Sequence, residues 1–272
     1  MKLQTNTPQY KKLNLGCGSR FASGWNNIDV YSAGTEVQKV NFLSPLPFKN
    51  GEFDAVYSSH VLEHFTPKEA DHLLSEVYRI LKPQGIIRIV VPDLESSCRE
   101  YLSILDSCDE KKYSWIILEL IDQMTRSTPS GEMGAYHANL AQGNDTILKD
   151  YVDIRSGLFR KDADTRIQKK ISIQKFKNKF LYIYLKLVSH LFSANIRSQV
   201  MILTGLGERH RWMYDQMSMS LLLKKHRFNS VRKCEYNTSA INGFNEDLLD
   251  INADGSPYKR VSLYIEAEKP KS

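Results

Sequence analysis

LNLGCGS (13–19), followed by GWNNIDV (24–30), is the stretch of this sequence that decides the fold. An apolar strand runs into a turn that holds Gly16 and Gly18, and a second short strand then ends on Asp29. Glycines at such a turn let the backbone approach a ligand closely, and a carboxylate after the next strand is a typical acceptor for ribose hydroxyls. The pattern predicts an adenosine-binding site at the carboxyl edge of a parallel sheet.

The spacing of this turn separates two classes of cofactor. The dinucleotide fingerprint has a third small residue three positions after its second glycine, where this chain has Phe21. Its acidic residue follows after about 20 residues, whereas Asp29 follows Gly18 by 11. A pyrophosphate is therefore disfavoured, and S-adenosylmethionine, which has a ribose but no pyrophosphate, fits the pattern. The alternatives are a plain turn after a strand and a strand-end role for Asp29.

Four segments, in this order, resemble the class I S-adenosylmethionine-dependent methyltransferases, in particular the methyltransferase type 11 group. They are LNLGCGS (13–19), NIDV (27–30), LPFKNGEFDAVYSSHVLEHF (46–65) and LKPQGIIRIVVPD (81–93). Two later segments, 226–236 and 260–270, look like the closing hairpin of that fold. The resemblance implies an α/β fold with a Rossmann-like, doubly wound sheet of seven strands, of which the last is antiparallel.

Residues 94–209 match nothing general and follow the fifth strand, where a connection leaves the sheet above a bound cofactor. An unstructured loop of this length is unusual in a compact domain. We therefore expect a helical cap that supplies substrate specificity. The expected division is a Rossmann-like core of residues 1–93 and 210–272, with the cap as an insertion of residues 94–209.

Local patterns predict where the elements lie. Thr66 to Glu69 form a capping box with proline at the first helical position, so a helix is expected from there to Pro83. The apolar run 86–91 is typical of a central parallel strand, in which Arg88 must be paired or lie near an end. The other predictions are strands at 12–15, 26–30, 53–57, 229–236 and 260–267, a third strand ending near Asn41, helical patterns over 94–126, 171–192 and 214–226, a break at 127–134 and a long connection at 237–259.

The resemblance also assigns cofactor contacts. Asn14 stands where many relatives have an acid, and we expect it to hydrogen-bond the cofactor amine. Asn41 stands where the family usually has Asp and is expected to meet the adenine amine, whereas Phe42 and Leu43 either flank the adenine or belong to the core. The full predicted cofactor set is Asn14, Gly16, Cys17, Gly18, Asp29, Val30, Asn41, Phe42, Leu43, Ser59 and His60.

Three histidines are candidates for a general base: His60 after the fourth strand, His137 in a glycine-bearing part of the cap, and His210 before the last helix. A hydroxyl acceptor needs such a base, which contributes about a hundred- to ten-thousand-fold to the rate. Their presence favours oxygen methylation. The predicted substrate-binding residues are Tyr136, His137, Arg209, His210 and Arg211, whose arginines suit an anionic acceptor group unless they are a solvated helix start.

HVLEH (60–64) matches the HxxEH string of one zinc peptidase class. We reject that interpretation because the string ends a strand in a methyltransferase pattern and no further ligand is evident. Some methyltransferases of this group hold a divalent ion with ExxEH, but His60 replaces the first Glu here. We predict no metal, with His60 facing the cofactor or the acceptor and with Glu63 and His64 bracing the loop.

Composition bounds the compartment and the partners. The 272 residues are 42% hydrophobic and 25% charged, as in soluble proteins, and no run of 18 apolar residues is present. Four cysteines without a CxxC pair, and an N-terminus without an apolar core, favour a reducing, cytoplasmic location.

The net charge of +6 is concentrated in one segment, because eight basic and two acidic residues lie between Arg160 and Lys179. The rest of the chain is balanced, which disfavours a nucleic-acid partner. Residues 160–192 resemble an amphipathic helix for an anionic membrane, which would place the protein peripherally at the inner membrane face. The alternative is a cap helix with solvated lysines.

Three functions stay open. The first is an S-adenosylmethionine-dependent O-methyltransferase for a sugar, a glycan or another small hydroxyl acceptor, with S-adenosylhomocysteine as product. HRWMYD (210–215) and SLYIEAEKP (262–270) support it, since they resemble bacterial methyltransferases of surface-polysaccharide biosynthesis. The second is a membrane-surface lipid or protein methyltransferase, and the third a catalytically silent S-adenosylmethionine-binding partner subunit. The absence of an Asn/Asp-Pro-Pro-Tyr string disfavours methylation of adenine or glutamine.

Overall fold

The computed structural model describes residues 10–31, 35–126, 130–143, 145–156, 183–184 and 209–271. The chain divides into two compact units. One consists of residues 1–95 with 212–272, and the other of residues 96–211. Within the described residues, the strands belong to the first unit, whereas the second unit is helical.

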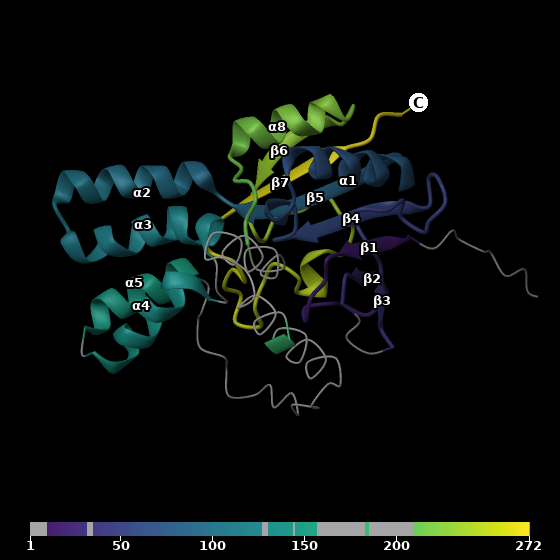
Figure 1. The fold of residues 1–272 in the computed structure, drawn as a ribbon. Helices are drawn as coiled ribbons and strands as arrows, with labels where there is room; N and C mark the ends of the chain where they lie inside the picture. The colour runs from purple at the N-terminus through teal and green to yellow at the C-terminus, as the bar shows by residue number, and fades with distance from the viewer. Residues whose placement is uncertain are drawn as a thin grey trace, which may run out of the picture. The chain divides into compact units, whose positions relative to one another are not determined.

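The first unit is built on a seven-stranded sheet with the order β3-β2-β1-β4-β5-β7-β6 (Figure 1). Its strands are β1 (Lys12–Leu15), β2 (Trp25–Asp29), β3 (Val37–Lys39), β4 (Phe53–Ser59), β5 (Leu81–Pro92), β6 (Asn229–Cys234) and β7 (Ser262–Glu268). β1 to β5 pair in parallel, whereas β7 is antiparallel to β5 and β6. The predicted α/β class, with seven strands and an antiparallel last strand, is confirmed.

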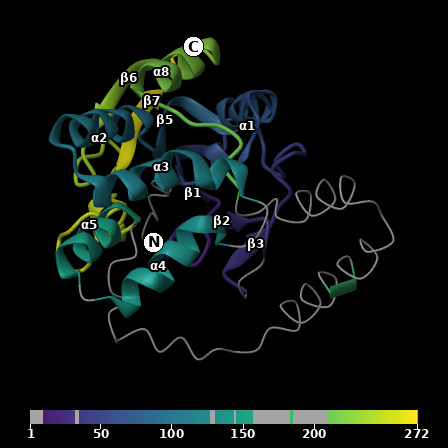
Figure 2. The same ribbon diagram turned by 60° about the vertical axis from the view of Figure 1, so that its left-hand side comes forward.

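Two helices cover the same face of this sheet, as the two views in Figures 1 and 2 show. α1 (Pro67–Ile80) begins with the predicted capping box, in which Thr66 and Glu69 bond to each other's backbone N–H. α8 (Gln216–Lys225) begins with a second capping box, between Asp215 and Ser218. The buried residues of α1 are Ala70, Leu73, Leu74, Val77 and Ile80, at the helical spacing that the sequence shows.

The opposite face of the sheet has no helix between β1 and β2, because only residues 16–24 join these strands. The connection between β6 and β7, which includes the short helix η2 (Asn245–Asp247), covers part of this face instead. Its Ile241, Phe244 and Leu249 pack against sheet residues that include Tyr57. The sequence predicted this long connection but did not predict that it covers one face of the sheet.

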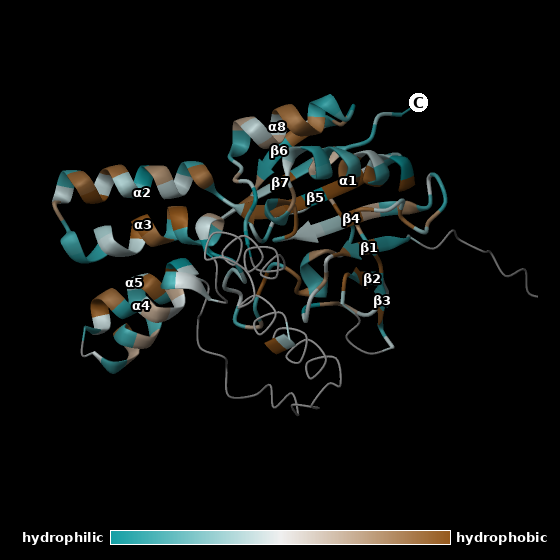
Figure 3. Ribbon diagram, viewed as in Figure 1, coloured by the Kyte–Doolittle hydropathy of each residue, from teal (hydrophilic) through white to brown (hydrophobic). Residues whose placement is uncertain are grey.

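Arg88, fully buried on β5, fastens this connection to the sheet. Its Nε donates to Asp250 at 2.7 Å and its Nη1 donates to Glu266 at 3.0 Å. The Tyr57 hydroxyl donates to the other oxygen of Asp250 at 2.6 Å. The prediction that Arg88 is paired is confirmed. In Figure 3 the rest of β5 is largely brown, as expected for a strand with two buried faces.

The second unit contains α2 (Leu94–Ser107), α3 (Glu110–Thr125), α4 (Gly131–Gln142) and α5 (Thr146–Ser156), with α2 starting at the end of the first unit. Trp115, Leu148 and Val152 form its buried cluster. α4 shows that the break predicted over 127–134 is too long. This helix begins at Gly131 because the Asp122 carboxylate accepts from the Glu132 N–H at 2.7 Å.

Several boundaries differ slightly from the predictions. β2 begins and ends one residue earlier than expected, and β5 begins at Leu81, which pairs with Phe53 across a register shift. The predicted helical pattern over 171–192 and the basic segment 160–179 lie outside the described residues, apart from 183–184. Among the helices that are described, none is long and apolar enough to span a membrane.

Candidate cofactor and acceptor site

The glycine turn after β1 has two glycines with different tasks. Gly16 and Gly18 both have positive φ, +73° and +54°. A Cβ on Gly16 would lie 2.2 Å from Cγ2 of Val61, whereas a Cβ on Gly18 would meet nothing within 4 Å. Gly16 is therefore required by packing inside the protein, whereas a Cβ on Gly18 would point into open space.

Asp29, at the end of β2, closes the turn from the other side. One carboxylate oxygen accepts from the Gly18 N–H at 2.9 Å, and the other accepts from the Tyr31 N–H at 3.0 Å. Each carboxylate oxygen can accept more than one hydrogen bond. Asp29 can therefore orient the turn and still receive two ribose hydroxyls.

Asn14 is buried beneath the turn, with 1% of its surface exposed. Its Nδ2 donates to Oδ1 of Asn27 at 3.2 Å and to the Arg20 carbonyl at 3.3 Å. The structure thus gives its amide a role inside the protein, while the predicted bond to a cofactor amine stays a prediction. Cys17 is also buried, and burial raises the pKa of its thiol to about 11, which makes it a poor nucleophile.

Exposed apolar side chains lie beyond the ends of β2 and β3. Val30 is 39% exposed and Leu43 is 52% exposed, although both lie at the edge where an adenine is expected. Phe42 is 3% exposed and belongs to the core, which supports the alternative that it has no ligand contact. The Asn41 side chain stabilises its own turn, accepting from the Leu43 N–H at 3.1 Å. Val30 and Leu43 are thus the residues of this set available to a flat ring.

His60 follows Ser59, the last residue of β4, and has a left-handed backbone with φ +54°. Its Nδ1 lies 3.0 Å from Oε1 of Glu63, and its Nε2 lies 3.1 Å from Oγ of Ser262. The side chain is 25% exposed, so the imidazole combines two fixed partners with access to solvent. The role predicted for His60 at the cofactor or the acceptor stays a prediction.

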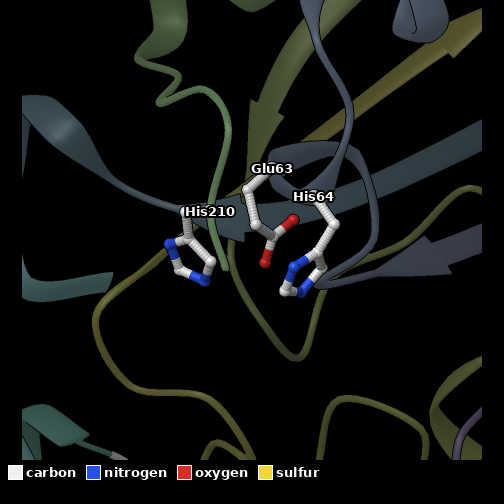
Figure 4. Close-up of side chains that lie close together, drawn as sticks. All are labelled: Glu63, His64 and His210. Atoms are coloured by element: carbon white, nitrogen blue, oxygen red, sulfur yellow. The ribbon is translucent and has the colours of Figure 1, made fainter. Parts of the chain in front are cut away.

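Glu63 and His64 belong to the short helix η1 (Leu62–His64), and Figure 4 shows their side chains close together. Glu63 is 1% exposed, and the ligand atoms of the two residues lie within 4.8 Å. The Glu63 carbonyl accepts from the Trp212 N–H at 3.2 Å. Burial raises the pKa of Tyr214, and the charge of Glu63 adds to this rise. The predicted bracing of the loop by Glu63 and His64 and the prediction of no metal both stay predictions.

The remaining predicted residues, which were assigned to substrate binding or catalysis, belong to the second unit. One of them, His210, is drawn in Figure 4. The rings of Tyr136 and His137 pack on Trp115, with centroid distances of 5.7 and 5.0 Å. Burial lowers the pKa of His137, against the opposite effect of the Asp153 charge. These contacts describe a helical core, and a role in substrate binding stays a prediction.

The segment 209–211 packs against the end of α3. Arg209 Nε donates to the Met124 carbonyl at 2.6 Å, and the His210 N–H donates to the Gln123 carbonyl at 2.9 Å. His210 is 6% exposed, so most of its surface is covered by protein. The roles predicted for Arg209, His210 and Arg211 in binding or catalysis stay predictions.

Two residues of the site were not found from the sequence. Arg20 donates to the carbonyls of Leu248 and Ile251, which joins the glycine turn to the β6–β7 connection. Ser262 reaches His60 from the start of β7. Ser262 begins the segment SLYIEAEKP (262–270), but the sequence does not reveal the partner of either residue, because each acts on a segment about 200 positions away.

Comparison with known proteins finds similarity to methyltransferases. Residues 26–89 match a family described as a methyltransferase domain. A 45-residue stretch is 47% identical to an uncharacterized methyltransferase of Synechocystis and covers 16% of this chain and 21% of that protein. The matched part thus spans about a fifth of the length of this curated relative.

Solved structures give weaker likenesses over most of the chain. A SAM-dependent methyltransferase from Methanosarcina mazei is 15% identical with a TM-score of 0.40, covering 96% of this chain and 93% of that one. The YcgJ protein from Bacillus subtilis is 11% identical with a TM-score of 0.39, covering 97% and 93%. The family match runs from β2 to β5 of the seven-stranded sheet, whose antiparallel last strand was predicted by the resemblance. Residues 26–89 thus resemble a methyltransferase domain.

Proposed function

We propose that the protein transfers a methyl group from S-adenosylmethionine to a hydroxyl of a sugar, a glycan or another small acceptor. The observation that carries the proposal is the open space above Gly18 beside a carboxylate that is already oriented by the turn. Together with the family match over residues 26–89, this favours an intact donor site over a silent subunit.

The residues at the carboxyl edge of the sheet fit the parts of the donor. Asp29 would hold the ribose hydroxyls, the backbone of 16–18 the methionine part, and Val30 with Leu43 the adenine. When bound, the donor supplies a methyl group already activated by its sulfonium. The protein has to align the acceptor oxygen and exclude water, and such positioning is worth roughly 7–11 kcal/mol.

His60 supplies the chemistry that a hydroxyl acceptor needs. It lies at the end of β4, its imidazole is partly exposed, and both ring nitrogens have polar partners. A base in this place can remove the acceptor proton as the oxygen becomes methylated. The second unit would then supply the acceptor specificity, with Tyr136, His137 and the segment 209–211 as its proposed binding residues.

We also propose an acceptor class and a cellular location, and both rest on sequence resemblance and charge. The resemblance of HRWMYD (210–215) and SLYIEAEKP (262–270) to polysaccharide-related methyltransferases favours a hexose or its nucleotide conjugate. A cytoplasmic protein would meet such nucleotide sugars directly. A membrane-surface acceptor remains the alternative suggested by the charge of residues 160–179.

Two measurements test the proposal. Calorimetry with S-adenosylmethionine is expected to show one site per chain, and tritium from a labelled methyl group is expected to appear in a UDP-, GDP- or dTDP-linked hexose. The same assay with phosphatidylglycerol vesicles tests the membrane alternative. Donor binding without transfer to either acceptor class would favour the silent subunit, and absence of donor binding would refute the proposal.

A further inference from the structure

Ser262 lies at the edge of the sheet where β4 and β5 end. It is the first residue of β7 and pairs with Pro92, the last residue of β5. His60 follows β4, and its N–H donates to the Val90 carbonyl at 2.8 Å. The antiparallel strand β7 therefore brings Ser262 to the residue proposed as the base, across 202 positions of sequence.

The imidazole of His60 is held from two sides. Its Nδ1 lies 3.0 Å from the Glu63 carboxylate, which is almost fully buried. A buried carboxylate has little water to stabilise its charge, so it favours a proton on the ring nitrogen that faces it. With the proton on Nδ1, the Nε2 atom is an acceptor, and the Ser262 hydroxyl, 3.1 Å away, donates to it.

The backbone around His60 supports a functional role for this geometry. A left-handed φ of +54° is uncommon for a residue other than glycine, and such strain persists where the surrounding contacts fix it. The next residue, Val61, packs directly on Gly16 of the cofactor turn. The position of the imidazole is thus tied to the position of the donor site.

We propose that Ser262 is a further residue of the acceptor site and passes the acceptor proton to His60, an inference that rests on the proposed function. As the acceptor oxygen bonds to the methyl carbon, and the electron pair of the carbon–sulfur bond stays on sulfur, Ser262 Oγ takes up the hydroxyl proton. The original Ser262 proton moves to Nε2 of His60. The Glu63 carboxylate balances the imidazolium that forms, so charge and protons are conserved.

A second Ser–His–carboxylate set, on the helices that cover the sheet, provides a matched control. His226 Nε2 lies 2.9 Å from the Asp71 carboxylate, and its Nδ1 lies 3.3 Å from Ser75 Oγ. The Ser75 hydroxyl already donates to the Asp71 carbonyl at 3.0 Å. Its proton is therefore engaged in the helix, and we expect no relay at this set.

The first test is the tautomer of His60, measured by ¹⁵N NMR of histidine-labelled protein at an alkaline pH where the His60 signals no longer change with pH. The expected spectrum shows a protonated Nδ1 and a hydrogen-bonded, unprotonated Nε2 for His60. Ser262→Ala should move the Nε2 signal towards that of a free acceptor nitrogen, and Ser75→Ala should leave the His60 signals unchanged. A protonated Nε2 in the wild type, or no response to Ser262→Ala, would overturn the proposal.

The second test is kinetic and uses tritiated S-adenosylmethionine with the UDP-, GDP- and dTDP-linked hexoses. Ser262→Ala should lower kcat about ten- to a hundredfold, within the range of proton-transfer catalysis, with KM nearly unchanged. Ser262→Thr, which keeps the hydroxyl, should restore most of the rate, and an unchanged kcat in Ser262→Ala would contradict the relay. Calorimetry separates the proposed function from the proposed relay. If the wild-type protein does not bind the donor, the proposed function is refuted, whereas the NMR result decides the relay.

Discussion

The carboxylate of Asp29 has two tasks that a single substitution does not separate. It accepts from the Gly18 N–H, and in the proposed complex it also accepts the ribose hydroxyls. Hydrogen bonds to a charged group are worth roughly 1.5–3 kcal/mol. Asp29→Ala should therefore weaken donor binding by about one to two decades in calorimetry.

Asp29→Asn is the matched variant, because its side-chain oxygen can still accept from the Gly18 N–H. If the ribose contact dominates, the Asp29→Asn variant should lose much of its affinity for the donor. Its urea unfolding midpoint should stay close to that of the wild type. Unchanged donor affinity in both variants would remove Asp29 from the site.

The two turn glycines give a second prediction at the same scale. Alanine at either position adopts an unfavourable left-handed backbone, which costs about 1–2 kcal/mol. Gly16→Ala should be clearly more destabilising in urea titrations, since its Cβ would also clash with Val61 at 2.2 Å. Adding Val61→Ala to Gly16→Ala should recover part of the stability, whereas equal losses for Gly16→Ala and Gly18→Ala would show that packing at Gly16 is unimportant.

Residues near one another in the sequence were predictable, and residues joined across the sheet were not. Gly16, Gly18 and Asp29 lie within 14 residues, and their spacing encodes the turn. The hydrogen bonds of Asn14 beneath the turn were not predicted, because an asparagine before such a turn fits either a ligand contact or a buried amide pair. The contact of Ser262 with His60 depends on the register of β7 against β5, which no local pattern specifies.

At the scale of elements, the strands and α1 follow from periodicity and capping, whereas the covering layer of the sheet does not. The capping box of Thr66 and Glu69 is a local interaction, so the sequence predicts its helix well. Arg88 helps to hold the β6–β7 connection over the sheet through Asp250, whereas its other carboxylate partner, Glu266, lies on β7 itself. The sequence indicated that Arg88 needs partners but could not identify them.

Arg88→Met tests how far this element depends on one cation. The substitution leaves the Asp250 carboxylate buried beside Tyr57 without its charge partner, and burial already raises the pKa of Asp250. Breaking a buried ion pair by removing one partner typically costs about 3–5 kcal/mol. We expect a loss of this size in the free energy of unfolding, measured by urea titration.

Arg232→Met is the control for Arg88→Met, since Arg232 also binds Glu266 but its side chain is 42% exposed. The Arg232 side chain keeps access to water, and the buried Glu266 keeps its bond to Arg88, so Arg232→Met should cost clearly less than Arg88→Met. A similarly small loss in Arg88→Met would mean that the connection is held by its apolar contacts alone.

The division of the whole molecule suggests that donor binding and acceptor choice are separable. Every residue proposed for the donor lies in the first unit, which has its own core. The chain leaves this unit after Glu95 and re-enters at Trp212, and the two segments meet there, since the Leu94 N–H donates to the Tyr214 carbonyl at 2.9 Å. A short glycine linker can therefore replace residues 96–211 without pulling the sheet apart.

We expect this shortened protein to bind S-adenosylmethionine within about tenfold of the wild-type affinity, the range left by about 1.4 kcal/mol, and to transfer no tritium to the nucleotide-linked hexoses. Circular dichroism and a cooperative urea transition would show that the sheet is intact, and Asp29→Ala in the shortened chain would serve as the control for specific donor binding. Loss of donor affinity in a folded shortened chain would mean that the second unit completes the donor site. Hexose methylation at the wild-type rate would instead show that acceptor specificity resides entirely at the sheet edge, around His60 and Ser262.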